Sequence, residues 1–353
     1  MMITQRQSNI ELLRLCCMFS LLFLHFCVFC LPQSENYASQ SGFWTQLPKI
    51  LCSFMTLQVN IFVLISGWFG IHTDFDKLIK FYLMCAFYGI LTYVLSLFLL
   101  ESSFSVKNAL LSLLPFSFLP GWWFVKAYLF LMLLAPLFNK AIEYMSRRDF
   151  LWVLCALTFI NVYCGFFARQ SINPDGCNFM QVMYMYFIGR YLALHVRFEE
   201  RKLRKWSAIC SFLGVGLYAT IWILNDEVLH IVNSLTFFNN NNPWSIFNSI
   251  IIFLFFTTLH FQSKTINWLA KGVFAVYLVH TSIWISSWWN GSLTAIYDSH
   301  NPLISWAIIC AVFVAFFMIV LCFDHLRMWV TDSIAFRIIK LIRHHVKRIN
   351  LHI

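Results

Sequence analysis

Long apolar stretches, each about the length of a membrane-spanning helix, recur through the whole chain of 353 residues. A helix of roughly 20 residues crosses the hydrocarbon core of a bilayer. We therefore expect an all-α polytopic membrane protein with about ten transmembrane helices. The expected spans lie at about residues 9–31, 47–70, 77–100, 121–139, 149–168, 178–197, 205–225, 243–261, 268–290 and 302–323.

The composition agrees with a membrane protein and argues against a nucleic-acid partner. Hydrophobic residues make up 60% of the chain and charged residues only 11%, whereas charged residues are about 25% of a typical soluble domain. The net charge of +10 comes from Lys and Arg in the loops, where such residues orient a membrane protein and meet anionic lipids. We therefore expect membrane lipids, and no nucleic acid, among its partners.

The loop charges also predict which way the chain is inserted. With the N-terminus on the inner side, most of the 25 Lys and Arg residues fall on that side, as the positive-inside rule requires. The outer side then has little beyond Lys49, Lys107, Lys126 and Arg169. We expect a multi-pass protein of the cell (inner) membrane, with both termini in the cytoplasm.

The last part of the chain has a different pattern. Residues 1–325 are predicted to form the membrane domain, and residues 326–353 a basic amphipathic cytoplasmic tail. In the tail, Ile334 and Ile338 follow helical spacing while Arg337 falls on the other side. A helix of this kind lies along the membrane surface, and we expect it to anchor the chain without taking part in chemistry.

The first apolar stretch carries two ionisable residues, Arg14 and His25. Such side chains are costly inside a membrane and by default indicate function. Eleven residues of helix make three turns with about 20° left over, and rise by roughly 16 Å, so both side chains lie on nearly one face. The pattern predicts that the two residues face one interior space at different depths.

His25 is a candidate general base. An imidazole with a pKa of about 6.5 can take a proton from a hydroxyl near neutral pH. Its alternative role is packing, with a hydrogen bond between helices. His280, near the middle of the ninth expected span, is the second deep histidine. It is predicted to assist His25, to contact substrate or to pack, and we take both histidines as candidate catalytic residues.

Arg14 is the first candidate for binding an anionic substrate. A guanidinium holds phosphate through two parallel hydrogen bonds. Its alternative role is an anchor at the inner interface, paired with Glu11 at the i,i+3 spacing. Arg190, in the inner half of the sixth expected span, can add to the same basic surface or reach the interface.

Further candidates for donor or substrate binding lie near the ends of expected spans: Lys77, Lys80, Trp123, Lys126, Tyr128 and Ser66. Aromatic residues at such depths are typical of an interface belt, but Lys126 lies one turn deeper than a belt requires. Ser66 and Gly67 form a small pair that permits close approach of two helices. The motifs of metal sites and of phosphate-binding glycine loops are missing, so we expect no metal and no bound cofactor.

Two outer loops, residues 226–243 and 290–302, are rich in Asn, Ser and aromatic residues. Amides and rings of this kind can bind sugars through hydrogen bonds and stacking. They are also common in ordinary extracellular loops, so the sequence leaves both roles open.

Several segments together resemble the integral-membrane acyltransferase family 3. Arg14 and His25 match the family pattern of an Arg, ten residues and a His in the first span. Four further segments resemble family motifs in the same order: NIFVLISGWF (60–69), GWWFVKAYLFLMLLAPLFNK (121–140), MYFIGRYLALH (185–195) and WLAKGVFAVYLVHTSIW (268–284). The chain departs from many members in having only Lys77 and Lys80 where they carry an arginine cluster.

The resemblance implies transfer of an acyl group, commonly acetyl, from acyl-CoA as co-substrate. The implied acceptor is a hydroxyl of a surface polysaccharide or a lipid-linked glycan. Arg14 would contact the phosphates of the donor, and His25 would activate the acceptor or otherwise serve the transfer.

Two other classes of function compete with this interpretation. One is a transporter or flippase for a glycan or lipid-linked sugar, a class that often has inverted repeats and helices broken at the midplane. The sequence predicts neither feature. The other is a non-catalytic membrane scaffold, which leaves the buried histidines and Arg14 without a role.

Overall fold

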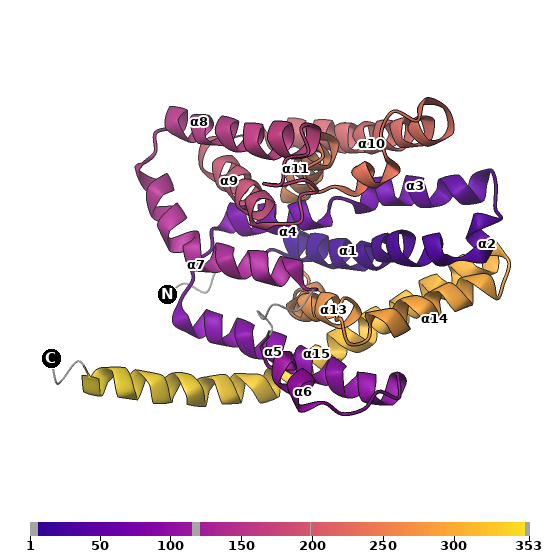
Figure 1. The fold of residues 1–353 in the computed structure, drawn as a ribbon. Helices are drawn as coiled ribbons and strands as arrows, with labels where there is room; N and C mark the ends of the chain where they lie inside the picture. The colour runs from indigo at the N-terminus through magenta and orange to yellow at the C-terminus, as the bar shows by residue number, and fades with distance from the viewer. Residues whose placement is uncertain (1–5, 115–120, 198, 350–353) are drawn as a thin grey trace.

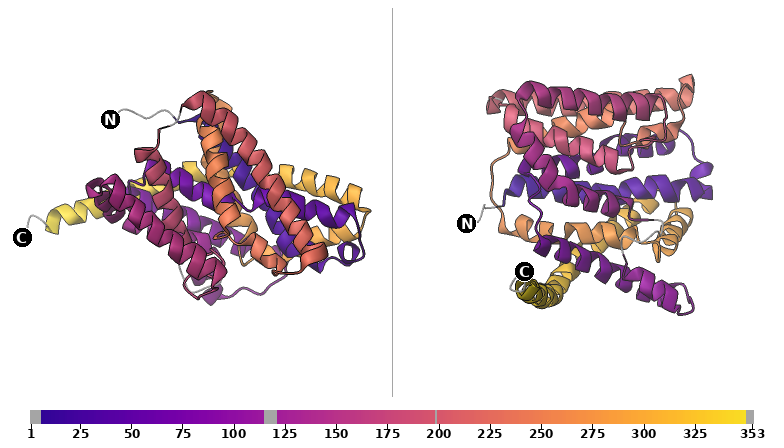
Figure 2. Two further views of the ribbon diagram at one scale, coloured as in Figure 1. Left: turned by 90° about the horizontal axis from the view of Figure 1, so that it is seen from above. Right: turned by 60° about the vertical axis from the view of Figure 1, so that its left-hand side comes forward.

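The computed structural model describes residues 6–114, 121–197 and 199–349, and every regular element in these ranges is helical. The longer helices lie roughly side by side, with α1 near the middle of the bundle (Figure 1 and Figure 2). The α-helices are α1 (Ser8–His25), α2 (Glu35–Ala38), α3 (Phe43–Met55), α4 (Gln58–Phe69), α5 (Phe75–Leu99), α6 (Val106–Ser112), α7 (Trp123–Tyr144), α8 (Arg147–Thr158), α9 (Phe179–His195), α10 (Glu200–Leu224), α11 (Pro243–Thr257), α12 (Lys264–Leu269), α13 (Val273–His280), α14 (Ser286–Asp298) and α15 (Pro302–Ile349). The π-helices are Phe26–Cys30, Phe159–Phe167 and Asn225–Leu229, and the 3₁₀ turns are Leu31–Gln33, Ser234–Phe238 and Ala270–Gly272.

The structure confirms an all-α polytopic membrane protein. Within the described ranges, seven helical segments are long and apolar enough to cross a membrane: Ser8–Gln33, Phe43–Phe69, Phe75–Leu99, Trp123–Tyr144, Arg147–Phe167, Glu200–Leu229 and Pro302–Leu341. Two further expected spans are present as the shorter helices α9 and α11, of 17 and 15 residues. The expected count of ten therefore includes segments that do not form long helices of their own.

The expected span 268–290 is wrong as a continuous helix. The chain forms α12, a 3₁₀ turn and α13, which ends at His280, and α14 begins only at Ser286. The expected second span is likewise interrupted, because Thr56 and Leu57 separate α3 from α4. The apolar composition continues through both breaks, so hydropathy alone does not reveal them.

Helix α15 passes through the expected domain boundary at residues 325 and 326 without a break. It has 48 residues, and at about 1.5 Å per residue it is roughly 72 Å long, against about 30 Å of hydrocarbon. Its C-terminal part extends beyond the neighbouring helices in the same direction (Figure 1). The helix expected in residues 326–353 is thus continuous with the helix of the last expected span.

Helices α4 and α9 approach closely at Gly67, as the small pair Ser66 and Gly67 predicts. A Cβ on Gly67 would lie 2.3 Å from the carbonyl oxygen of Tyr186 and 3.0 Å from Cα of Gly189. Only glycine fits this crossing without a shift of the backbone.

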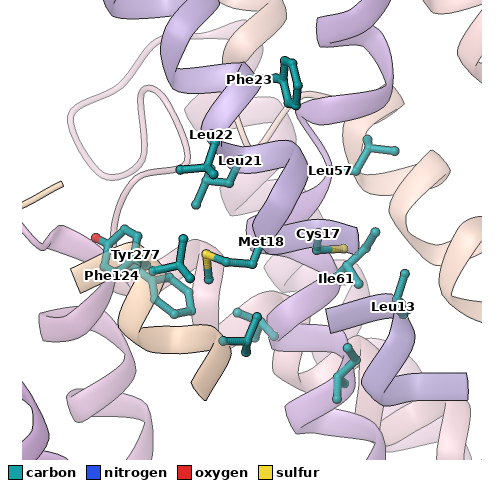
Figure 3. Packing of buried hydrophobic residues seen from close by; sticks show 14 of the residues in the cluster. Leu13, Cys17, Met18, Leu21, Leu22, Phe23, Leu57, Ile61, Phe124 and Tyr277 are labelled. Carbon is teal, nitrogen blue, oxygen red and sulfur yellow. The ribbon is translucent and has the colours of Figure 1, made fainter. Parts of the chain in front are cut away.

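Apolar side chains of α1 fill the centre of the bundle. Leu13, Met18 and Leu22 are each 2% exposed. Figure 3 shows Met18 directed toward Phe124 of α7 and Tyr277 of α13. This packing brings α7 and α13 against the half of α1 that ends in His25.

Candidate functional site

His25 and His280 form a hydrogen-bonded pair at the ends of two helices. Nδ1 of His25 lies 2.9 Å from Nε2 of His280, and Nδ1 of His280 lies 2.5 Å from the carbonyl oxygen of Val276. The imidazole of His280 is 3% exposed. His25 lines a cavity, whereas His280 does not line it. Among the described residues, His280 is the hydrogen-bond partner of Nδ1 of His25.

The partners of His280 determine which nitrogens carry protons when both rings are neutral. A carbonyl oxygen only accepts, so Nδ1 of His280 donates to Val276 and Nε2 of His280 is left as an acceptor. Nδ1 of His25 must then donate to that acceptor. This assignment, which follows from the hydrogen bonds, leaves the lone pair on Nε2 of His25 free to accept a proton.

The local backbone explains why both histidines sit at helix ends. A π-helix, Phe26–Cys30, begins directly after His25, and such turns are frequent at functional sites. On the other side, α13 ends at His280, and the indole Nε1 of Trp122 donates to the carbonyl oxygen of Leu278 at 3.2 Å. The indole thus donates a hydrogen bond to one of the carbonyl oxygens that lack a helical partner where α13 ends.

The cavity beside His25 has a volume of about 200 Å³ and is largely apolar. Its polar wall residues other than His25 include Gln58 and Asn240. Trp123, which the sequence singled out, also lines it, next to Phe124. The wall therefore comes from α1 and the π-helix after it, from α4, α7 and α13, and from the loops before α9 and α11.

Arg14 lines two further cavities toward the N-terminal end of α1. One, of about 270 Å³, also contains Arg6, Lys271 and Tyr128 in its wall. The other, of about 550 Å³, is lined by four cationic side chains and one carboxylate: Arg14, Lys77, Lys80, Arg327 and Asp332. The two cavities share Arg14, Ser66, Phe81, Met84 and Tyr128.

Three phenylalanines separate the basic cavities from the histidine cavity. Phe62, Phe124 and Phe274 line both the 270 Å³ cavity and the 200 Å³ cavity. The rings of Phe124 and Phe274 are 6.3 Å apart. The series of cavities thus leads from the cationic residues, past these rings, to His25.

Arg14 forms the ion pair with Glu11 that its spacing predicts, and it also lines two cavities. Its Nη1 lies 3.4 Å from a carboxylate oxygen of Glu11, which also pairs with Arg6 at 3.5 Å. These are long contacts for ion pairs, and the Arg14 side chain is 31% exposed. Arg14 is therefore paired with Glu11 and still accessible from the cavity.

Of the other candidate residues from the sequence, some line the three cavities and one does not. Ser66 and Tyr128 line both basic cavities, and their hydroxyl oxygens are 3.2 Å apart. Lys126 lies on α7 between Trp123 and Tyr128 but lines none of these three cavities. The aromatic residues of this segment therefore contribute to the walls, while Lys126 does not.

Arg190 is near the 550 Å³ cavity without lining it. One of its terminal nitrogens lies 3.0 Å from the position that a Cβ on Gly70 would take, and its buried Nε has no hydrogen-bond partner within the described ranges. Gly70 and His72 line the cavity. The structure thus places Arg190 behind the loop that forms this wall, and not beside Arg14.

The four asparagines at positions 239–242, in the loop before α11, are buried. Asn239, Asn240, Asn241 and Asn242 are 8%, 8%, 0% and 4% exposed. Asn242 donates to the hydroxyl of Tyr218 at 3.0 Å, and Asn241 donates to a backbone carbonyl at 2.6 Å. These amides tie the loop before α11 to α10 and to the loop before α9.

Sequence reasoning missed the contribution of α15 to the basic cavity. Arg327, Met328, Thr331 and Asp332 line it, although all four fall in the segment expected only to anchor the chain. Asp324, Arg327 and Thr331 follow the i,i+3 and i,i+4 spacing of one helix face. That spacing, next to a long apolar stretch, is the signal from which a polar interior contact could have been predicted.

The fold and the site define a class of protein: a polytopic membrane protein in which a partly buried histidine, hydrogen-bonded to a buried one, lines a cavity that adjoins a basic cavity. A family model described as an acyltransferase domain matches residues 7–324. The chain belongs to this acyltransferase family, as its segments suggested. Searches of curated proteins and of solved structures found no match.

Proposed function

We propose that this membrane acyltransferase transfers an acetyl group from acetyl-CoA to a hydroxyl of a surface polysaccharide or lipid-linked glycan. The observation that carries the proposal is the free Nε2 of His25, in a cavity that adjoins a basic one. General-base help of this kind contributes typically about 10²–10⁴-fold to a rate.

The reaction needs one proton acceptor and one leaving group. Nε2 of His25 takes the proton of the acceptor hydroxyl as its oxygen attacks the thioester carbonyl carbon. The bond from this carbon to sulfur breaks, and the electron pair leaves with the CoA thiolate. The imidazolium of His25 then returns its proton to the thiolate, so the imidazole is restored and no group remains on the protein.

His280 acts on this reaction as a positioning residue. Its Nε2 accepts from Nδ1 of His25, and its own Nδ1 is fixed by Val276. The bond keeps the basic nitrogen of His25 directed away from His280, and it stabilises the imidazolium that forms during the transfer.

The cavities match the two ends of the donor. Acyl-CoA has phosphates at one end and a thioester at the other, and Arg14 and His25 are separated by about 16 Å along a helix. Phosphates would bind among the cationic side chains, and the thioester would pass Phe62, Phe124 and Phe274 toward His25. A dry cavity of about 150 Å³ holds one benzene, so about 200 Å³ favours a small acyl group such as acetyl.

The same reasoning gives an orientation in the membrane. Acyl-CoA is a cytoplasmic metabolite, so the basic cavities would open to the cytoplasm, with both termini on that side of the cell membrane. The loop charges favour the same orientation.

The second candidate, a transporter or flippase for a glycan or lipid-linked sugar, gains support from one observation. The break between His280 and Ser286 is of the kind that transporters use at substrate sites. The sequence-based argument against a transporter relied in part on unbroken helices, and that part was wrong.

One experiment separates the two candidates. The purified full chain in detergent is incubated with acetyl-CoA labelled in the acetyl group and with candidate glycans. The proposal expects label on the glycan. In a second arm, the same glycans carry a label of their own and are added to proteoliposomes that contain the chain. If the glycan crosses the bilayer unmodified and no acetyl transfer occurs in either arm, the chain is a transporter and the proposal is wrong.

A further inference from the structure

A buried ion pair on α15 forms part of the wall of the 550 Å³ cavity. Nε and Nη2 of Arg327 donate to the two carboxylate oxygens of Asp324 at 2.5 and 3.1 Å, and Nη1 donates to Thr331 at 3.0 Å. The hydroxyl of Tyr88, on α5, donates to Asp324 at 2.7 Å. Asp324 is 1% and Arg327 7% exposed.

This cluster fixes the guanidinium in one orientation. Two nitrogens of the Arg327 guanidinium donate to the carboxylate of Asp324, and this carboxylate also accepts a hydrogen bond from the hydroxyl of Tyr88. A guanidinium has five N–H groups, so Arg327 has more donors than the three bonds to Asp324 and Thr331 use. Asp324 does not line the cavity, whereas Arg327 does.

Four cations and one carboxylate line the cavity, and Arg327 is the most buried of these cations. Lys80 is 3.3 Å from Asp332, and Lys77 pairs with Asp74 at 3.5 Å and donates to the carbonyl of His72. Both lysines are about half exposed, with side-chain exposures of 54% for Lys77 and 51% for Lys80. Arg327 is thus the buried cation, held in one orientation by its hydrogen bonds, among more exposed ones. A guanidinium fixed in this way suits bidentate binding of phosphate.

We propose that Arg327 is a further donor-binding residue, which binds phosphate oxygens of the nucleotide end of acyl-CoA from the α15 side of the cavity. The proposal rests on the proposed function. It also makes Asp324 and Tyr88 positioning residues for this arginine, and it gives α15 a role in substrate recognition beyond residue 324, where the family match ends.

The test measures binding of CoA to the purified full chain in detergent by isothermal titration. Arg327→Lys keeps the charge beside Asp324 but removes the fork, and we expect its dissociation constant for CoA to rise by about tenfold to a hundredfold. The double variant Asp324→Asn/Arg327→Gln leaves no unpaired buried charge, and we expect at least the same loss. Arg337→Gln, an exposed residue of the same helix, is the matched control and should bind CoA like the wild type.

A second measurement separates phosphate binding from a structural role. S-acetylpantetheine lacks the nucleotide phosphates, so Arg327→Lys should use it as donor with unchanged kcat/KM while its KM for acetyl-CoA rises. Equal losses with both donors would show that the ion pair only supports the fold, and the inference would be wrong. If the wild type binds CoA and both Arg327 variants bind it equally well, only this inference fails, whereas a wild type that binds no CoA overturns the proposed function as well.

Discussion

His280 provides a sharp test of the mechanism, because it is expected to act only through His25. In His280→Phe the ring volume is largely kept, but Nδ1 of His25 loses its acceptor at 2.9 Å. A buried N–H without a partner costs about 1–3 kcal/mol. His25 avoids this cost by rotating its ring or by moving its proton from Nδ1 to Nε2. In both cases an unprotonated nitrogen no longer faces the hydroxyl of the acceptor substrate.

The size of the effect follows from that cost. Since about 1.4 kcal/mol corresponds to tenfold, we expect kcat to fall by roughly 10- to 100-fold in His280→Phe, with the KM for acetyl-CoA unchanged. His280→Gln supplies an amide oxygen that can accept from Nδ1 of His25, and it should recover most of the activity.

The assay is steady-state acetyl transfer by purified variants in detergent, with acetyl-CoA and the acceptor varied separately. His300→Phe is the matched control, because His300 is an exposed histidine beyond α14. Wild-type kcat in His280→Phe would refute the positioning role. A rise in the KM for acetyl-CoA without a change in kcat would show instead that His280 affects donor binding.

Three further predictions concern the donor site, the passage and the helix crossing. Arg14→Lys loses the guanidinium fork, so we expect about tenfold weaker CoA binding by titration, and an unchanged dissociation constant would contradict the role of Arg14. Phe274→Trp enlarges a ring shared by two cavities, so transfer should fall while CoA binding persists, and unimpaired transfer would show that the donor does not pass this ring. Gly67→Ala places a Cβ 2.3 Å from the Tyr186 carbonyl oxygen and should destabilise the fold by about 1–3 kcal/mol, whereas Gly216→Ala, with no atom within 4 Å of its Cβ position, should not. Thermal unfolding measures the difference, and equal melting temperatures would contradict the close crossing of α4 and α9.

The parts of the site on one helix could be predicted from the sequence. Helical geometry alone places Arg14 and His25 on one face, and in the structure His25 lines a cavity that adjoins one lined by Arg14. The small residue Gly67 likewise predicted a close crossing of helices, because glycine is the residue that leaves room for a neighbouring backbone.

The pairing of His25 with His280 could not be predicted in this way. The two residues are 255 positions apart in the chain, so their contact depends on how α1 and α13 pack. The break after His280 was also hidden, because the residues on both sides of it are apolar and a hydropathy pattern does not register hydrogen bonds that a helix gives up.

The continuity of the tail with the last span could not be predicted for a related reason. Its basic and apolar residues follow an amphipathic pattern, and this pattern does not distinguish a surface helix from the continuation of a span. Arg327 and Asp332 line a cavity only because α15 runs past α5. Composition also suggested that the asparagines of residues 239–242 are exposed, whereas they satisfy buried polar groups of neighbouring segments.

The central claim is that His25 is the base that activates the acceptor hydroxyl. The most direct measurement compares acetyl transfer by the wild type and by His25→Ala at equal protein levels, with CoA binding measured on the same samples. We predict that kcat falls by about 10²–10⁴-fold in the variant while its affinity for CoA stays at the wild-type value. Full transfer activity in His25→Ala would contradict the account.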